Sequence, residues 1–166
     1  TLNVNGAYEK HQGYMTDVLN QFALDFVSRK HERPWSLFFA HKAVHPDAFQ
    51  HPDGTLDLAR HGGYRVAERH EDLYRGCVFP RKPNMLSPAE VVKEKPAWAE
   101  AMALKQSAAA KAVLEAIQPG SQEEIRLRAC MMAAVDEGVG AIFETLDRSG
   151  VLDDTVIVFF GDNGYF

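Results

Sequence analysis

The strongest constraint on the fold lies between Ser121 and Phe160, where a long amphipathic helix pattern leads into an uninterrupted apolar run. Ser121 and Glu124 have the spacing of a capping box, in which each side chain accepts a hydrogen bond from the other residue's backbone N–H. Apolar residues then recur every three or four positions, and Gly150 stands where a helix-ending glycine is expected. Residues 156–160, Val-Ile-Val-Phe-Phe, are typical of a strand buried on both faces. The segment predicts a helix over about 122–149 and then a central parallel strand.

A second helix and strand precede this segment. Apolar residues at helical spacing indicate a helix over 16–30, with Thr16 as its N-cap and Asp17 in its first turn. Pro34 blocks its continuation, and the aromatic-rich residues 35–40 have the composition of a short buried strand. We expect residues 37–40 and 156–160 to lie parallel in one sheet, with the long helix packed on it. The predicted fold class is α/β, a mostly parallel sheet flanked by helices, in a single domain over residues 1–166.

A long irregular segment separates the two helix-and-strand regions. From about residue 46 to residue 96 the periodicity fades, and Pro and Gly recur among His, Arg and Asp. Loops of this length inside compact domains are either functional or disordered. We therefore interpret the segment as an excursion over a site. Residues 97–117, rich in Ala, Lys, Glu and Leu, predict a further helix.

Composition narrows the classes of partner. Lys and Arg number 18 against 23 Asp and Glu, giving a formal net charge of −5 with no block of like charge, which argues against a nucleic-acid partner. No apolar run, residues 156–160 included, approaches the roughly 18–20 residues of a membrane span. Cys77 and Cys130 are too few for a disulfide framework.

Polar residues follow both predicted strands, and ligands of open α/β sheets bind at the carboxyl ends of strands. After the last strand comes Gly-Asp-Asn-Gly, in which the oxygens of Asp162 and Asn163 suit a hard divalent cation such as Ca²⁺ or Mg²⁺. The alternative is a simple turn. After the first strand, Lys42 and His45 supply a fixed positive charge and a proton donor that could grip an oxyanion such as sulfate or phosphate. Here the alternative is a solvated, His-rich turn.

Two other candidate sites are less favoured. His41 and His45 would share one helix face and could bind zinc, with further ligands from His51, His61 or His70. That arrangement needs a helix where the residues before Pro46 favour extended chain. Asp136, inside the long helix, is interpreted as an exposed or structurally paired carboxylate.

Taken together, these landmarks resemble the sulfatase family of the alkaline-phosphatase-like hydrolases. The matching segments keep their order and spacing along nearly the whole chain, and only residues 47–118 match loosely. They are Gly-Tyr-Met-Thr-Asp at 13–17, the run from Pro34 to Pro46 with its Lys-Ala-Val-His, Met-Ala-Ala-Val-Asp at 132–136 with Val-Gly at 139–140, Gly-Val-Leu-Asp-Asp-Thr at 150–155, and Phe-Gly-Asp-Asn-Gly at 160–164.

The resemblance implies roles for the strand-end residues. In that family the Asp-Asn pair completes a divalent-metal site, usually calcium, which corresponds to Asp162 and Asn163 here. The family's sulfate-contacting histidine corresponds to His45, and Lys42 is a further candidate for the catalytic site. The implied substrate is a sulfate-ester small molecule or a sulfated glycan. The nucleophile of such enzymes is a formylglycine made from Cys or Ser.

The sequence also departs from the family pattern. Family members carry two adjacent metal-binding aspartates and a Cys-x-Pro-Ser-Arg-like motif before the His45 region, and neither is found here. Cys77 precedes a Pro and an Arg, but the Pro is one residue late and the segment follows His45, so Cys77 is rejected as the nucleophile. We expect an interior portion of a sulfatase that is inactive alone. The alternatives are a phosphodiester or phosphonate monoester hydrolase of the same superfamily, and a non-catalytic α/β binding module.

Overall fold

A computed structural model describes residues 1–47, 49–51, 56–57, 63–80 and 121–161. Two compact units make up the chain. The first contains Thr1–Arg75 and Arg126–Ile157, and the second contains Gly76–Ile125 and Val158–Phe166. The helix expected over 97–117 lies outside the described residues. The described elements are β1 (Leu2–Val4), β2 (Ala7–Glu9), α1 (Met15–Val27), β3 (Phe49–Gln50), β4 (Leu56–Asp57), the 3₁₀ helix η1 (Glu68–His70) and α6 (Gln122–Arg148).

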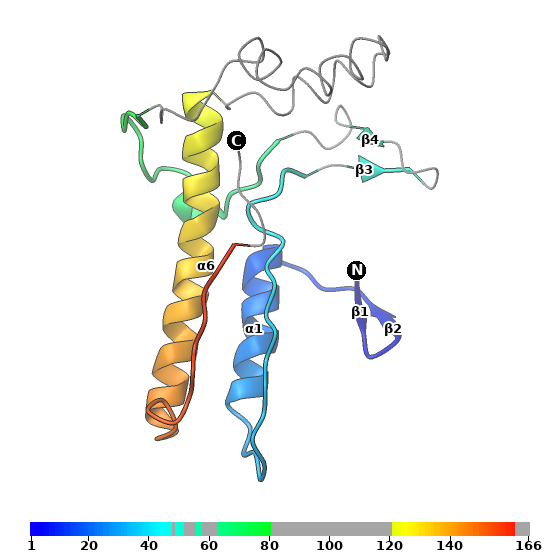
Figure 1. Cartoon of the computed structure of the whole chain (residues 1–166). Coiled ribbons are helices and arrows are strands. Elements are labelled where there is room, and N and C mark those ends of the chain that lie inside the picture. The colour runs from blue at the N-terminus through cyan, green and yellow to red at the C-terminus, as the bar shows by residue number, and fades with distance from the viewer. Residues whose placement is uncertain (48, 52–55, 58–62, 81–120, 162–166) are drawn as a thin grey trace, which may run out of the picture. The chain divides into compact units, whose positions relative to one another are not determined.

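The described strands form two short antiparallel hairpins (Figure 1). Strand β1 pairs with β2 across a two-residue turn, Asn5 and Gly6, in which both residues have positive φ angles of 51° and 92°. Asn-Gly favours this turn because both residues tolerate the left-handed region. The N–H of Gly6 also donates to Asn3 Oδ1 at 2.8 Å. Strands β3 and β4 form the second hairpin, within the segment interpreted as an excursion.

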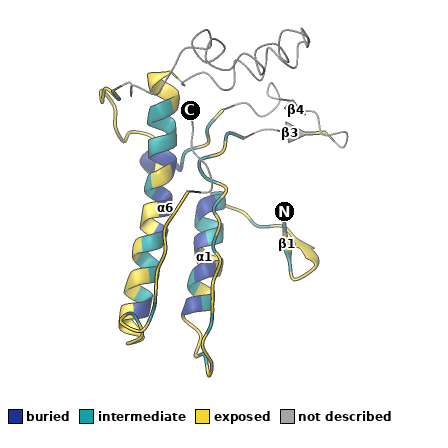
Figure 2. Cartoon of the chain, viewed as in Figure 1, coloured by how far each residue is buried: buried dark blue, intermediate teal, exposed yellow. Residues whose placement is uncertain are grey.

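Helices α1 and α6 lie side by side and enclose most of the described core (Figure 2). The buried face of α1 carries Ala23 and Val27, and that of α6 carries Ala134 and Val135. The α1 helix was predicted, but Thr16 is not its N-cap. The helix begins at Met15 with Tyr14 as its N-cap, so Thr16 falls inside the first turn on the buried side.

Both ends of α6 follow the sequence prediction. The N–H of Ser121 donates to Glu124 Oε2 at 2.8 Å, and the N–H of Glu124 donates to Ser121 Oγ at 3.2 Å, which is the reciprocal bonding of a capping box. At the other end Gly150 has a φ of 68°, and the N–H of Val151 donates to the Leu146 carbonyl at 3.1 Å. That bond is the long one of a Schellman motif, which requires a left-handed residue at the glycine position.

The two segments expected to form a parallel sheet have no strand structure here. Residues 37–40 and 156–160 have no regular secondary structure, and large aromatic side chains in both are exposed, Phe38 at 82% and Phe159 at 71%. A strand needs a neighbour to pair its backbone N–H and C=O groups. No described segment supplies that neighbour, so the parallel sheet stays a prediction.

The irregular middle segment has some structure of its own. Besides β3 and β4 it contains η1, where Ala67 and His70 are buried. The segment is therefore attached to the helical core at η1, where His70 also bonds to Glu137 of α6. Among the described helices, none combines the length and apolar composition needed to cross a membrane.

Candidate functional site

Lys42 and His45 are brought together by a tight turn. The backbone N–H of His45 donates to the Lys42 carbonyl at 3.0 Å, and both side chains are exposed. His45 Nδ1 lies 2.7 Å from the Pro46 carbonyl. Because a carbonyl oxygen can only accept, Nδ1 carries the proton in this arrangement. His45 Nε2 therefore holds a lone pair in the neutral ring and a second proton in the cation, which allows it to bind an anion or to release a proton.

Contacts with residues 63–65 hold this turn in place. The N–H of Asp47 donates to the Gly63 carbonyl at 2.8 Å, and Arg65 Nε lies 2.5 Å from Asp47 Oδ2. The hydroxyl of Tyr14, just before α1, donates to the Arg65 carbonyl at 3.0 Å. Burial raises the pKa of Tyr14, so this hydroxyl keeps its proton at neutral pH. The turn is thus linked through residues 63–65 to the start of α1.

His41 lies next to the turn in a different environment. Its ring packs against Phe39 at a tilt of 57° with centroids 4.2 Å apart, and neither ring nitrogen has a hydrogen-bond partner among the described residues. Burial lowers the pKa of His41, so the ring is neutral at neutral pH. His41 therefore differs from His45, which is exposed and bonded to a carbonyl.

The zinc interpretation finds no support in the described residues. They contain no group of three or more His, Cys, Asp and Glu side chains placed to hold a metal ion. His70 instead donates to Glu137, with Nε2 2.7 Å from Oε1. His61 lies outside the described residues. The described chain therefore offers a single-histidine turn at His45, not a histidine cluster.

The proposed metal ligands Asp162 and Asn163 lie outside the described residues, directly after Gly161. We expect this pair to lie close to His45, because both segments follow strands that are expected to be parallel in one sheet. Asp136 lies on the exposed face of α6, as expected. Cys77 is exposed and Cys130 is buried, and they are not joined by a disulfide.

Sequence reasoning missed a charged cluster centred on Arg69. Its guanidinium makes a two-pronged contact with Asp17, Nη1 to Oδ2 at 2.8 Å and Nη2 to Oδ1 at 2.7 Å. It also donates to Glu137 Oε2 from Nε at 3.0 Å and from Nη2 at 2.6 Å. Hydrogen bonds from Arg69, and then from His70, lower the pKa of Glu137, while Asp17 and Glu137 raise the pKa of Arg69. The only sequence signal was Asp17, assigned to the helix first turn.

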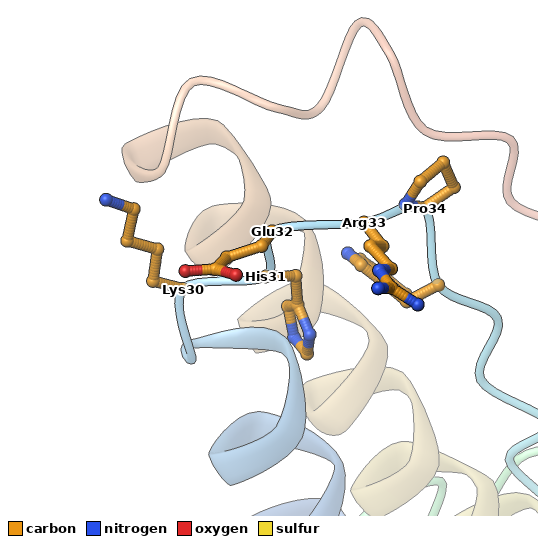
Figure 3. A pocket seen from close by; sticks show the side chains of 6 residues that line it. Lys30, His31, Glu32, Arg33 and Pro34 are labelled. Carbon is orange, nitrogen blue, oxygen red and sulfur yellow. The ribbon is translucent and has the colours of Figure 1, made fainter.

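The loop after α1 forms an open hollow of about 500 Å³ (Figure 3). Six consecutive residues line it: Lys30, His31, Glu32, Arg33, Pro34 and Trp35. His31 and Trp35 pack with Phe26, at centroid distances of 4.9 to 5.4 Å. The hollow follows the C-terminal end of α1, whereas the Lys42–His45 turn is linked to the N-terminal end. It is therefore separate from the candidate site.

Comparison with known proteins identifies the family. The model of the sulfatase family matches residues 2–165. An arylsulfatase of Volvox carteri is 35% identical over 100 residues, which cover 60% of this chain and 14% of that protein. An arylsulfatase of Chlamydomonas reinhardtii is 36% identical over 100 residues, which again cover 60% of this chain and 14% of that protein. An N-acetylglucosamine-6-O-sulfatase of Bacteroides thetaiotaomicron is 22% identical over 98% of this chain and 35% of that protein.

No solved structure matches the chain. The chain spans between 14% and 35% of the length of these curated relatives. The family match nevertheless runs through the whole region that holds the Lys42–His45 turn, both described helices and the Asp162–Asn163 pair. The chain therefore belongs to the sulfatase family.

Proposed function

We propose that the chain is an interior portion of a sulfuric-ester hydrolase. The observation that carries this proposal is the family match over residues 2–165, which includes every candidate site residue. The relatives are named arylsulfatase and N-acetylglucosamine-6-O-sulfatase, so their names favour sulfate esters over phosphate esters. Family membership also implies an alkaline-phosphatase-like α/β fold. In that fold the proposed parallel strands over 37–40 and 156–160 deliver both candidate segments to one sheet edge.

His45 and Lys42 bind the sulfate group in this proposal. Lys42 supplies a permanent positive charge against the anionic oxygens. Protonated His45, held through Nδ1 on the Pro46 carbonyl, presents Nε2–H to a sulfate oxygen. When the S–O bond of the ester breaks, that proton passes to the departing alcohol oxygen and leaves His45 neutral. A formylglycine, whose motif is not found in these 166 residues, would supply the nucleophile that attacks sulfur.

Asp162 and Asn163 would hold the divalent cation, Ca²⁺ or Mg²⁺. One carboxylate oxygen and one amide oxygen fit a hard cation, which prefers oxygen ligands, and they suit a soft metal poorly. The cation would neutralise charge on the sulfate group. Six or more oxygen ligands are usual for calcium, so this pair is a partial site. The substrate class is a sulfate-ester small molecule or a sulfated glycan.

The test is made in the complete protein that carries this chain. Hydrolysis of 4-nitrophenyl sulfate and of N-acetylglucosamine 6-sulfate is compared with that of 4-nitrophenyl phosphate and bis(4-nitrophenyl) phosphate. We expect sulfate esters to be preferred, and we expect His45→Ala to lower kcat by about 10²–10⁴-fold, the range for a general acid. Lys42→Ala should also impair turnover. Lys30→Ala, an exposed lysine beyond the other end of α1, is the matched control and should behave as wild type.

Two results would refute the assignment. Preference for a phosphate ester would place the protein in the other branch of the superfamily. Undiminished turnover in His45→Ala would remove His45 from the site.

The metal is tested separately. Dialysis of the complete protein against a chelator should abolish turnover, and added Ca²⁺ or Mg²⁺ should restore it.

A further inference from the structure

We propose that Arg69 is a positioning residue for the turn that carries Lys42 and His45. The inference rests on the proposed function, because it assigns Arg69 an effect on the reaction that passes through His45. Arg69 does not itself reach the substrate in this proposal. It fixes the segment against which the turn is held.

Arg69 joins three separate parts of the first unit. It lies in η1, its partner Asp17 lies in the first turn of α1, and its partner Glu137 lies in the middle of α6. The guanidinium uses its fork for both carboxylates at distances of 2.6 to 3.0 Å. His70 adds a second bond to Glu137, and its side chain is buried. Figure 1 shows the short η1 turn beside α6.

The residues that lead from Gly63 to η1 have little structure of their own. Residues 64–67 have no regular secondary structure, so side-chain and terminal contacts decide where they lie. Arg69 fixes their carboxyl-terminal end, and Tyr14 fixes Arg65 through its carbonyl. Gly63 and Arg65 then hold Asp47, two residues after His45. A shift of η1 would therefore be transmitted through these few residues to the candidate catalytic side chains.

The energetics separate positioning from stability. The side chains of Arg69, Asp17 and Glu137 are 44%, 40% and 50% exposed, and ion pairs of such exposure add little to the free energy of unfolding. The contacts require a specific geometry, because only the planar, forked guanidinium of arginine can donate to both carboxylates at these angles. Lysine keeps the charge and loses the fork. The proposal therefore predicts a larger loss of turnover than of stability.

The experiment measures kcat, KM and Tm of Arg69→Met and Arg69→Lys in the complete protein with 4-nitrophenyl sulfate. We expect Arg69→Met to lower kcat/KM about tenfold or more, by the sensitivity of catalysis to misplaced groups, while Tm changes little. Arg69→Lys should recover only part of the loss. The matched control is Arg75→Met, an exposed arginine six residues further along that pairs with Asp72. Arg75→Met should leave kcat/KM and Tm near the wild-type values.

The double variant Arg69→Met/His45→Ala tests whether the effect passes through His45. If it does, Arg69→Met costs less in the His45→Ala background than in the wild type, because only Lys42 is then left to position. If the two losses multiply, Arg69 acts by another route and the inference is wrong. Unchanged kcat/KM in Arg69→Met, or a Tm loss that accounts for the activity loss in both variants, also overturns it. An undiminished His45→Ala variant refutes the proposed function instead, so the two failures are distinguishable.

Discussion

Replacement of Gly138 by alanine tests how closely α1 and α6 pack. A Cβ atom at Gly138 would lie 2.2 Å from Oδ1, 2.3 Å from Cγ and 2.4 Å from Nδ2 of Asn20. These distances are well inside van der Waals contact, so the Asn20 side chain has to move. That movement has a cost, because Asn20 is only 7% exposed and its Nδ2 donates to the Ala134 carbonyl at 3.0 Å.

Two costs oppose one gain in this substitution. Loss of the buried hydrogen bond from Asn20 to Ala134 costs about 0.5–1.5 kcal/mol. Insertion of a methyl group into a packed contact costs about 1–3 kcal/mol. Helix propensity returns about 1 kcal/mol, because glycine is that much less favourable than alanine inside a helix. We expect Gly138→Ala to lower the free energy of unfolding by about 0.5–3.5 kcal/mol.

Urea unfolding followed by circular dichroism measures the effect, with Gly140→Ala as the matched control. Gly140 lies in the same helix, and a Cβ atom there meets nothing within 4 Å. It should gain up to about 1 kcal/mol from helix propensity alone. In the double variant with Asn20→Ala the clash is absent, so a coupling of at least about 0.5 kcal/mol is expected. Equal stabilisation by Gly138→Ala and Gly140→Ala would refute the close contact of the helices.

Three further predictions follow from the caps, the charged cluster and the site. Ser121→Ala removes one half of the capping box and should cost about 1 kcal/mol in urea unfolding, and an unchanged midpoint would contradict the cap. Hydrogen bonds from Arg69, which also pairs with Asp17, and from His70 lower the pKa of Glu137. Glu137 therefore stabilises the fold above the ordinary glutamate pKa of about 4.3 and loses that contribution as pH falls further. Tm measured from pH 6 to pH 3 should fall less steeply in Glu137→Gln, and parallel profiles would be contrary to this. The purified 166-residue chain should hydrolyse neither aryl sulfates nor aryl phosphates, and metal-dependent turnover by it would show that a nucleophile was overlooked.

The helices could be predicted because their signals are local. The capping box at Ser121 and the left-handed Gly150 are each satisfied within a few residues, and both were recognised from spacing alone. The N-cap of α1 was misassigned for a related reason. Thr16 is a favoured N-cap residue, but this position is buried in the folded structure, and the helix begins before it. Tertiary burial therefore overrode a local preference.

The missed features depend on distant residues. Asn20 and Gly138 look ordinary in sequence, and their significance comes from a contact across 118 positions. The Arg69 cluster joins residues separated by 52 and 68 positions. Each of its members is a charged residue of a kind common on protein surfaces, so neither composition nor periodicity distinguishes them. Candidate catalytic residues were found more readily, because Lys42 and His45 follow a recognisable segment.

The exposed aromatic residues show that the two expected strands need partners from elsewhere in the protein. Phe38 and Phe159 are 82% and 71% exposed, and full burial of such a side chain is worth about 1.5–3 kcal/mol. Both segments therefore have a substantial driving force to pair with further strands, which helices α1 and α6 do not supply. The same two segments lead to Lys42 on one side and to Asp162 on the other. Pairing of these segments would align the residues proposed to bind sulfate with those proposed to bind the cation. We therefore expect assembly of the sheet and assembly of the active site to be a single event in the complete protein.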